Sequence, residues 1–227
     1  MKERPILFSG PMVRAILDGT KRQTRRIVKP QPTTEPIDRS EWECGPRRNP
    51  CPPHLFPFRR PDDEHSHYAY ACPYGVPGDR LWVRERWAAH DTLDDLSPQR
   101  IDEIDEDRNI WYAVDGDSGW GSLLADPSWR GRWRPSIHMP RWASRITLEI
   151  ADVRVQRLQD ISGLDAIAEG LDHVNDGAAA FGVKGFARSW SNDPRVAYRA
   201  LWESINGAGS WDANPWVWAI SFRVDHD

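Results

Sequence analysis

Two long polar stretches interrupt the apolar sequence of this chain and limit what it can fold into. Residues 30–77 are rich in Pro, Arg, Asp, Glu and His and have little apolar periodicity, and residues 90–109 are acidic and polar. Both are therefore predicted to be irregular insertions in one domain that spans residues 1–227. The core has to come from the short apolar segments around them.

These apolar segments have the alternation of short β-strands. Strands are predicted over residues 5–9, 80–85, 110–114, 146–150 and 216–224, with a further one through Val153 and Val155. Residues 80–85 give the strongest signal, because a Gly-Asp turn precedes them and apolar residues alternate along them.

Two helices are predicted from capping signals. Pro11 suits the first position of a helix over residues 12–17, and Gly19 can take the left-handed conformation that closes it. Ser162 has the character of an N-cap for a second helix, which stops at Gly170.

A third helix is predicted to start at Asp193, with three apolar positions at Val196, Leu201 and Ile205. Short strands still outnumber helices along the chain. This balance favours an α+β fold, namely a small, mostly antiparallel β-barrel with a few added helices and long loop insertions.

The composition argues against several classes of function. A formal net charge of -4 disfavours a protein that coats duplex DNA through a broad basic surface. No stretch approaches the roughly 18 apolar residues of a membrane span, and the N-terminus lacks the apolar core of a signal peptide. A cytoplasmic protein with no membrane partner is expected.

Against this acidic background, residues 21–29 place five cations around one hydroxyl, in the order Lys-Arg-Gln-Thr-Arg-Arg-Ile-Val-Lys. Such a segment suits an anionic or nucleotide-like ligand. If it is extended, alternation places Arg22, Thr24 and Arg26 on one face, with Lys21 at the bend beside them.

Lys21 and Thr24 form a candidate base and nucleophile. Neighbouring cations and partial burial both lower the pKa of a lysine, so Lys21 can serve as a base toward Thr24 Oγ or a water. Arg26 is predicted to contact a phosphate or a base edge, the alternative being a salt bridge to a carboxylate such as Asp79. The remaining cations give general electrostatic support: Arg22, Arg25 and Lys29. A solvated basic strand edge is the alternative for the whole segment.

A second group of candidates lies on the strand over residues 80–85 and in the aromatic, basic residues 129–145. The side chains that suit base stacking or phosphate contact are Trp82, Trp133, Trp142, Arg84, Arg134 and Arg141. Glu85 next to Arg84 is a further ligand-binding candidate, although buried arginine and glutamate on a strand more often bind each other. The alternative for the indoles is packing in the core.

Cysteines and histidines in the first insertion raise a zinc hypothesis. The residues concerned are Cys44, Cys51 and Cys72, with His54, His65 and His67 between them. None of the cysteine spacings is a Cys-x-x-Cys knuckle, so the default interpretation is three free thiols, no metal and no cofactor.

Three motifs together resemble the ASCH family. They are Gly19-x-Lys21-x-x-Thr24-x-Arg26, Gly78-Asp79-x-Leu81 and Ala166-x-x-Glu169-Gly170. The resemblance implies a β-barrel related to the RNA-binding PUA domain. In the details of residues 81–85, 139–143 and 214–218 the chain is similar to larger phage and prophage members.

One branch of that family hydrolyses the amide of acetylated cytidine, and another is reported to cut single-stranded RNA. For the first branch, the resemblance implies Thr24 as nucleophile, Lys21 as its activating base and Glu169 as proton shuttle or ligand-orienting group. The fold alone does not decide the reaction.

Three hypotheses of function follow. The first is a pocket that binds a nucleoside or single-stranded RNA and hydrolyses it at Lys21, Thr24 and Glu169. The second is a non-catalytic RNA-binding module that uses the same cations. The third is a phage structural or interaction protein whose insertions contact protein partners.

Overall fold

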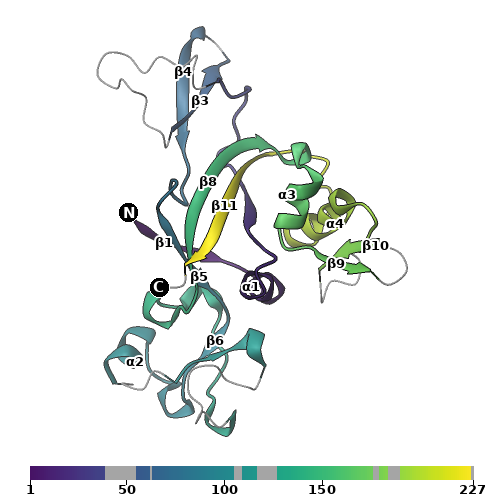
Figure 1. The fold of residues 1–227 in the computed structure, drawn as a ribbon. Helices are drawn as coiled ribbons and strands as arrows, with labels where there is room; N and C mark the ends of the chain where they lie inside the picture. The colour runs from purple at the N-terminus through teal and green to yellow at the C-terminus, as the bar shows by residue number, and fades with distance from the viewer. Residues whose placement is uncertain are drawn as a thin grey trace.

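The computed structural model describes residues 1–38, 55–61, 63–104, 109–116, 127–175, 179–183 and 190–225. Its centre is a five-stranded sheet with the order β1-β5-β8-β11-β2 (Figure 1). The strands are β1 Glu3–Leu7, β2 Gln23–Ile27, β5 Arg80–Arg84, β8 Thr147–Arg157 and β11 Trp216–Asp225. β1 runs parallel to β5, and the other neighbouring pairs are antiparallel.

The predicted α+β class is confirmed, but no closed barrel is found in the described part of the chain. β1 and β2 stay at the two edges of the sheet. A side chain links the two edge strands: the Arg26 guanidinium of β2 donates to the carbonyl oxygen of Leu7, in β1, at 2.6 Å. The two segments predicted around Ile150 and Val155 form one long strand, β8, because β11 pairs along its whole length.

Helix α1, Gly10–Leu17, connects β1 to β2 and buries Val13 and Ile16 in the main core. Gly19 follows it with φ of 72°, so the predicted left-handed helix stop is present. The backbone N–H of Lys21 then donates to Ala15 O at 2.9 Å. This bond holds the start of the basic segment against the helix.

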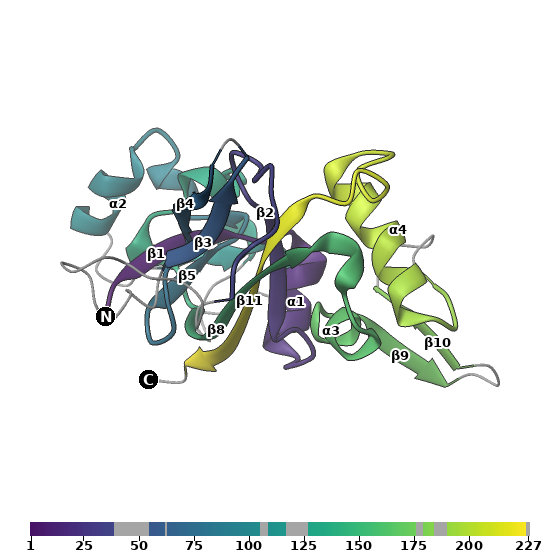
Figure 2. The same cartoon turned by 90° about the horizontal axis from the view of Figure 1, so that it is seen from above.

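Helices α3, Gly163–Ala168, and α4, Pro194–Asn206, lie together at one end of the sheet with the hairpin of β9 and β10 (Figure 2). The hairpin strands are Asp172–Asn175 and Ala179–Gly182. Both predicted caps form: Ser162 Oγ accepts from Asp165 N at 3.0 Å, and Asp193 Oδ1 accepts from Arg195 N at 2.8 Å. Their hydrogen bonds are local, which is why sequence alone predicted them.

The buried face of α4 differs from the predicted one. Val196 and Ile205 are 54% and 56% exposed, whereas Leu201 is buried as expected. Tyr198 and Trp202 complete the buried face. These large side chains share the face of Leu201 at helical spacing, so they determine the orientation of the helix.

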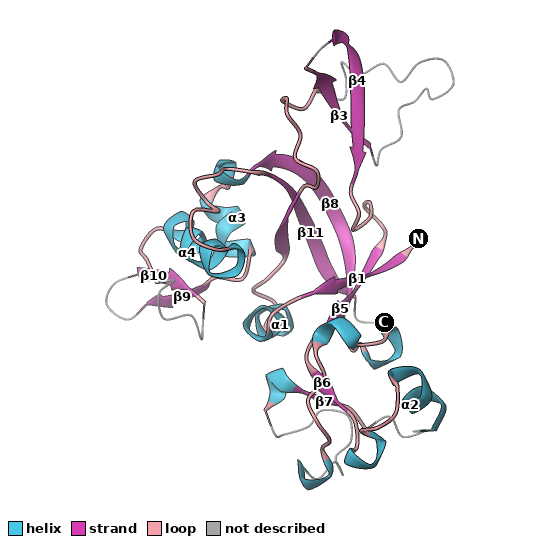
Figure 3. Cartoon of the chain, turned by 180° about the vertical axis from the view of Figure 1, so that it is seen from behind, coloured by secondary structure: helices cyan, strands magenta, loops and turns pink. Residues whose placement is uncertain are grey.

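The first insertion is not irregular throughout. Within residues 30–77, β3 Leu55–Arg60 and β4 Asp63–Ala71 form a hairpin that projects from one end of the sheet (Figure 3). Phe58 is fully buried there and packs edge-on against Tyr70 and Trp216, at 5.4 and 5.9 Å between ring centroids. Aromatic contacts across strands order this polar sequence.

The second insertion, residues 90–109, is also partly ordered. It contributes helix α2, Pro98–Ile104, and the short helix η2, Asp91–Leu93, to a lobe at the opposite end of the molecule (Figure 1). The lobe includes strands β6, Trp87–Ala88, and β7, Trp111–Tyr112. It has a core of its own, in which Trp87, Ile101 and Met139 are fully buried. In the predicted strand over residues 110–114, only Trp111–Tyr112 is a strand, and the short helix η3, Ala113–Asp115, follows.

Four further short helices complete the described elements: η4 Pro127–Trp129, η5 Ser136–His138, η6 Arg141–Ala143 and η7 Leu158–Asp160. Of the helices in the described ranges, none is long and apolar enough to cross a membrane.

Candidate functional site

A cavity of about 380 Å³ lies where the edge strands β1 and β2 approach each other, and we call it the Lys21 pocket. Lys21, Thr24 and Glu169 all line it. Arg26 of β2 and Tyr198 of α4 contribute to the same wall. The three residues of the predicted catalytic set therefore meet at one cavity, although Glu169 is far from the other two in sequence.

Lys21 and Glu169 form a buried ion pair. Lys21 Nζ donates to Glu169 Oε2 at 3.1 Å and to the backbone oxygen of the same residue at 2.7 Å. Both residues are only 3% exposed. The backbones of the two residues also pair as an isolated bridge, so main chain and side chain hold them together.

A glycine makes this close approach possible. Gly170, directly after Glu169, has φ of 96°, a conformation that side chains disfavour. A Cβ atom there would lie 3.0 Å from Cβ of Lys21 and 3.1 Å from Cβ of Ala15. A glycine after Glu169 in the third motif is thus explained by sterics, because the end of α3 packs directly on Lys21.

Arg25 is the site residue that sequence reasoning missed. Its guanidinium donates to Glu169 Oε1 at 2.8 Å and to Gln23 Oε1 at 2.6 Å, and it forms an ion pair with Asp165 at 3.2 Å. Arg25 is 4% exposed, so it is not a general surface cation. The signal that points to it is the acidic pair Asp165 and Glu169, one helical turn apart, which provides carboxylates for a buried arginine.

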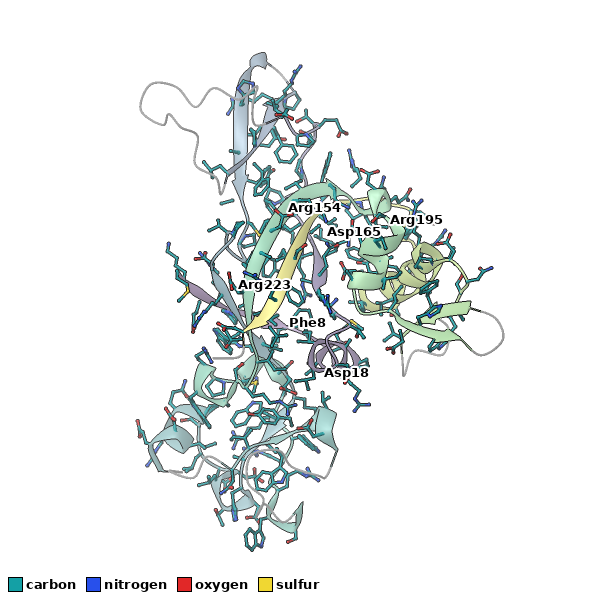
Figure 4. All side chains as sticks on the ribbon, viewed as in Figure 1. Phe8, Asp18, Arg154, Asp165, Arg195 and Arg223 are labelled. Atoms are coloured by element: carbon teal, nitrogen blue, oxygen red, sulfur yellow. The ribbon has the colours of Figure 1, made fainter. Side chains whose placement is uncertain are left out.

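Several charged groups meet around the start of α3. Asp165 also accepts hydrogen bonds from Gln23 at 3.1 Å and from Arg154 at 3.3 Å, and Figure 4 shows Arg154 on β8 close to Asp165. The pKa of Asp165 is lowered, since the hydrogen bond from Gln23 and the charges of Arg154 and Arg25 outweigh the effect of its burial. The network therefore keeps this carboxylate ionised and holds Arg25 against Glu169.

Burial changes the proton affinity of two groups in the pocket. The pKa of Lys21 is lowered, because removal of its ammonium from water outweighs the favourable charge of Glu169. The pKa of Tyr198 is raised well above its ordinary value, mainly by burial, so this residue stays a neutral phenol. Among the described residues, Thr24 Oγ1 has no hydrogen bond to Lys21 Nζ, whose bonds both go to Glu169.

Arg26 lines the pocket, but it does not bind Asp79. Its guanidinium lies 5.1 Å from the ring centroid of Phe8, and within the described residues its one hydrogen bond goes to Leu7 O. Asp79 instead accepts from Arg4 and from the backbone of Lys2, both at 2.8 Å. The reason is that Asp79 precedes β5 at the strand start, where the N-terminus of parallel β1 lies.

The other predicted ligand contacts do not line the Lys21 pocket. Glu85 is 1% exposed and accepts two hydrogen bonds from Arg145, at 3.0 and 3.1 Å, so its partner is not Arg84. Arg141 binds Glu3 at 2.8 Å on the surface. Trp82 is buried under the guanidinium of Arg84, at 4.6 Å.

The aromatic, basic segment 129–145 is used mainly for structure. Arg134 donates to the backbone oxygens of Leu93, Asp94 and Leu96 and holds the lobe together. Trp142 packs edge-on against Trp87 at 5.8 Å. Trp133 lies outside the Lys21 pocket as well, and the guanidinium groups of Arg86 and Arg130 lie against its ring.

Only some of the candidate zinc ligands lie within the residues that the structure describes. Cys44, Cys51 and His54 lie outside them, as does the side chain of His65. Cys72 is buried, and burial raises the pKa of its thiol to about 11, which disfavours the thiolate that binds metal. No metal-binding group of three or more His, Cys, Asp or Glu occurs in the ranges that the structure describes.

No protein-family model, curated protein or solved structure matches this chain.

Proposed function

We propose that this chain is a PUA-like ASCH protein whose Lys21 pocket binds a cytidine-like nucleoside, free or within single-stranded RNA, and hydrolyses an amide on its base. The observation that carries the proposal is the meeting of Lys21, Thr24 and Glu169 at one cavity. Its volume of about 380 Å³ lies within the range of small-molecule sites. Arg26 at the wall supplies a cation for the ribose-phosphate side of the ligand.

The chemistry is acyl transfer from an acetylated exocyclic amine of cytosine. Thr24 Oγ1 attacks the acetyl carbon, and the neutral amine of Lys21 takes the hydroxyl proton. The C–N bond then breaks, the departing cytosine nitrogen takes that proton, and the acetyl group remains as an ester on Thr24. Water hydrolyses the ester with Lys21 again as base, which yields cytidine and acetate.

Glu169 and Arg25 set the electrostatic environment of Lys21, the proposed base. The lowered pKa of Lys21 increases the fraction of neutral amine at neutral pH, as a general base requires. Glu169 stabilises the ammonium that forms when the proton arrives, since its carboxylate lies 3.1 Å from Nζ. Arg25 binds the other carboxylate oxygen at 2.8 Å, so Glu169 is fixed in orientation and is a shared counterion for two cations.

The test is hydrolysis of acetylated cytidine, followed by chromatographic separation of cytidine. We expect Thr24→Ala to lower kcat by about 10²- to 10⁴-fold, whereas Thr24→Ser retains a hydroxyl and keeps measurable turnover. Lys21→Met is expected to be as damaging as Thr24→Ala, because the two act as a unit. Turnover at the wild-type rate in Thr24→Ala would contradict the assignment.

Binding without bond cleavage is the second candidate, and one observation favours it. Both described hydrogen bonds of Lys21 Nζ go to Glu169, so the amine is engaged as a structural ion pair. A pure binding module retains affinity for cytidine and single-stranded RNA in Thr24→Ala and releases no acetate in any variant. The same purified proteins decide between the two functions.

A further inference from the structure

A second concave surface lies in the lobe, and we call it the Arg84 groove. It has a volume of about 760 Å³, and its lining includes Arg84, Arg132, Trp133, Arg134 and His138. Of the described residues that line it, none is Asp or Glu, although the chain as a whole carries a net charge of -4. Cationic and apolar side chains thus gather on one surface of an acidic protein.

Among the arginines that line this groove, Arg84 retains donors for a ligand, whereas Arg134 uses its donors for backbone oxygens of the lobe. Within the described residues, Arg84 donates one hydrogen bond, from Nη1 to Ile137 O at 3.2 Å, and its guanidinium lies 4.6 Å from the ring of Trp82. Arg86 does not line the groove, but it is exposed beside it, since its guanidinium lies 5.5 Å from the ring of Trp133, which does line it. Flat guanidinium groups held on indoles supply both stacking surfaces for bases and forks for phosphates.

The groove adjoins the Lys21 pocket. Leu7 lines the pocket, Arg84 lines the groove, and the two residues are register partners in the parallel pair β1 and β5. Their side chains leave the sheet on the same face, with the strands about 4.8 Å apart. Phe8 N also donates to Arg84 O at 3.4 Å, so the walls of the two sites are directly connected.

We propose that the Arg84 groove binds the nucleotides that flank the base held in the Lys21 pocket. The substrate is then a segment of single-stranded nucleic acid, and a free nucleoside occupies only part of the site. This inference rests on the proposed function for the identity of the pocket ligand. The combination of stacking planes, guanidinium groups and a lining whose described residues include no carboxylate is what a single strand requires.

The test measures the anisotropy of a fluorescent single-stranded RNA of about ten nucleotides, which suits a site of this kind. Arg86→Gln and Arg84→Gln are each expected to weaken RNA binding about tenfold, with acetylated cytidine bound as in wild type. The slope of log affinity against log salt should fall by about 0.7 for each phosphate that the variant no longer neutralises. Arg223→Gln is the matched control, because Arg223 on β11 is 70% exposed in its side chain and lines neither the pocket nor the groove.

Wild-type RNA affinity in both arginine variants would overturn the proposal, as would competition by polyglutamate as strong as that by RNA. Arg86 is exposed, so Arg86→Gln keeps the test valid even if Arg84→Gln impairs folding. The two proposals also fail separately. If the arginine variants lose RNA binding and wild type does not turn over acetylated cytidine, the groove is supported and the hydrolase is rejected. If wild type turns over acetylated cytidine and the arginine variants bind RNA as wild type does, the hydrolase is supported and the groove is rejected.

Discussion

Two buried carboxylates in this molecule make an instructive comparison. Glu169 accepts from Lys21 and Arg25, and Glu85 accepts twice from Arg145, which also binds Asp115 at 2.6 Å. Both carboxylates are at most 3% exposed. Glu169 lines a cavity beside a hydroxyl, whereas the guanidinium of Arg145 lies 3.9 Å from the ring of Tyr112 within the lobe.

The comparison shows that a buried ion pair is not by itself a sign of function. Burial of charge costs several kcal/mol unless hydrogen bonds compensate it, and each of the two carboxylates accepts two side-chain hydrogen bonds. Access distinguishes them: the Lys21 network borders the Lys21 pocket, whereas the Arg145 network links Glu85, directly after β5, to Asp115 of the lobe. The proposed chemistry uses the first network, and the second holds two parts of the fold together.

The largest effect on stability is expected from Arg145→Met. This change leaves Glu85 buried without its cation, which costs about 3–5 kcal/mol in the free energy of unfolding. The effect is measured by urea denaturation. A loss below about 1 kcal/mol would show that the Glu85 network does not hold the lobe.

Gly170→Ala tests the contact between α3 and Lys21. The new Cβ meets Lys21 and Ala15 at 3.0 and 3.1 Å and takes an unfavourable φ, so we expect a loss of about 2–3 kcal/mol and weaker ligand binding. Gly207→Ala is the matched control: Gly207 has the same φ of 96° but nothing within 4 Å of its Cβ position. It should cost only about 1 kcal/mol and leave binding unchanged. Equal losses of stability in both variants would show that the close contact at Gly170 does not contribute.

The two networks should respond to pH with opposite signs. The pKa of Glu85 is raised above its ordinary 4.5, chiefly by burial, so the folded state binds its proton more tightly and stability falls as pH rises above about that value. The pKa of Lys21 is lowered below 10.5, again chiefly by burial, so stability rises as pH increases toward 10.5.

These signs are checked by comparing the unfolding free energy of wild type with Glu85→Gln and with Lys21→Met over a pH series. The stability of wild type relative to Glu85→Gln should decline from pH about 4.5 upward. Relative to Lys21→Met it should improve on the alkaline side. If both stability differences changed in the same direction with pH, burial could not be the dominant cause of both pKa shifts.

The smallest effect is expected from Arg141→Gln. Arg141 pairs with Glu3 on the surface, where the two side chains are 43% and 38% exposed. Such a pair contributes about 0–1 kcal/mol and is weakened by salt. RNA binding should stay at the wild-type value in the anisotropy measurement, since Arg141 lines neither the pocket nor the groove and its guanidinium donates to Glu3 and Thr147.

Local signals were sufficient for much of the fold. The stops at Gly19 and Gly170 and the caps at Ser162 and Asp193 depend on hydrogen bonds or dihedral angles within a few residues. The insertions were misjudged because their order comes from aromatic contacts between distant residues, as for Phe58 with Trp216. Sequence periodicity does not register such contacts.

The sequence by itself determined the composition of the candidate site: the basic segment with Lys21 and Thr24, and the acidic end of a helix at Glu169. Tertiary structure alone decided that these groups share one cavity, that Arg25 and not Arg26 binds Glu169, and that an open sheet leaves room between its edges. The reason is physical. Alternation specifies the face of a strand on which a side chain lies, but packing with distant elements decides what that face meets.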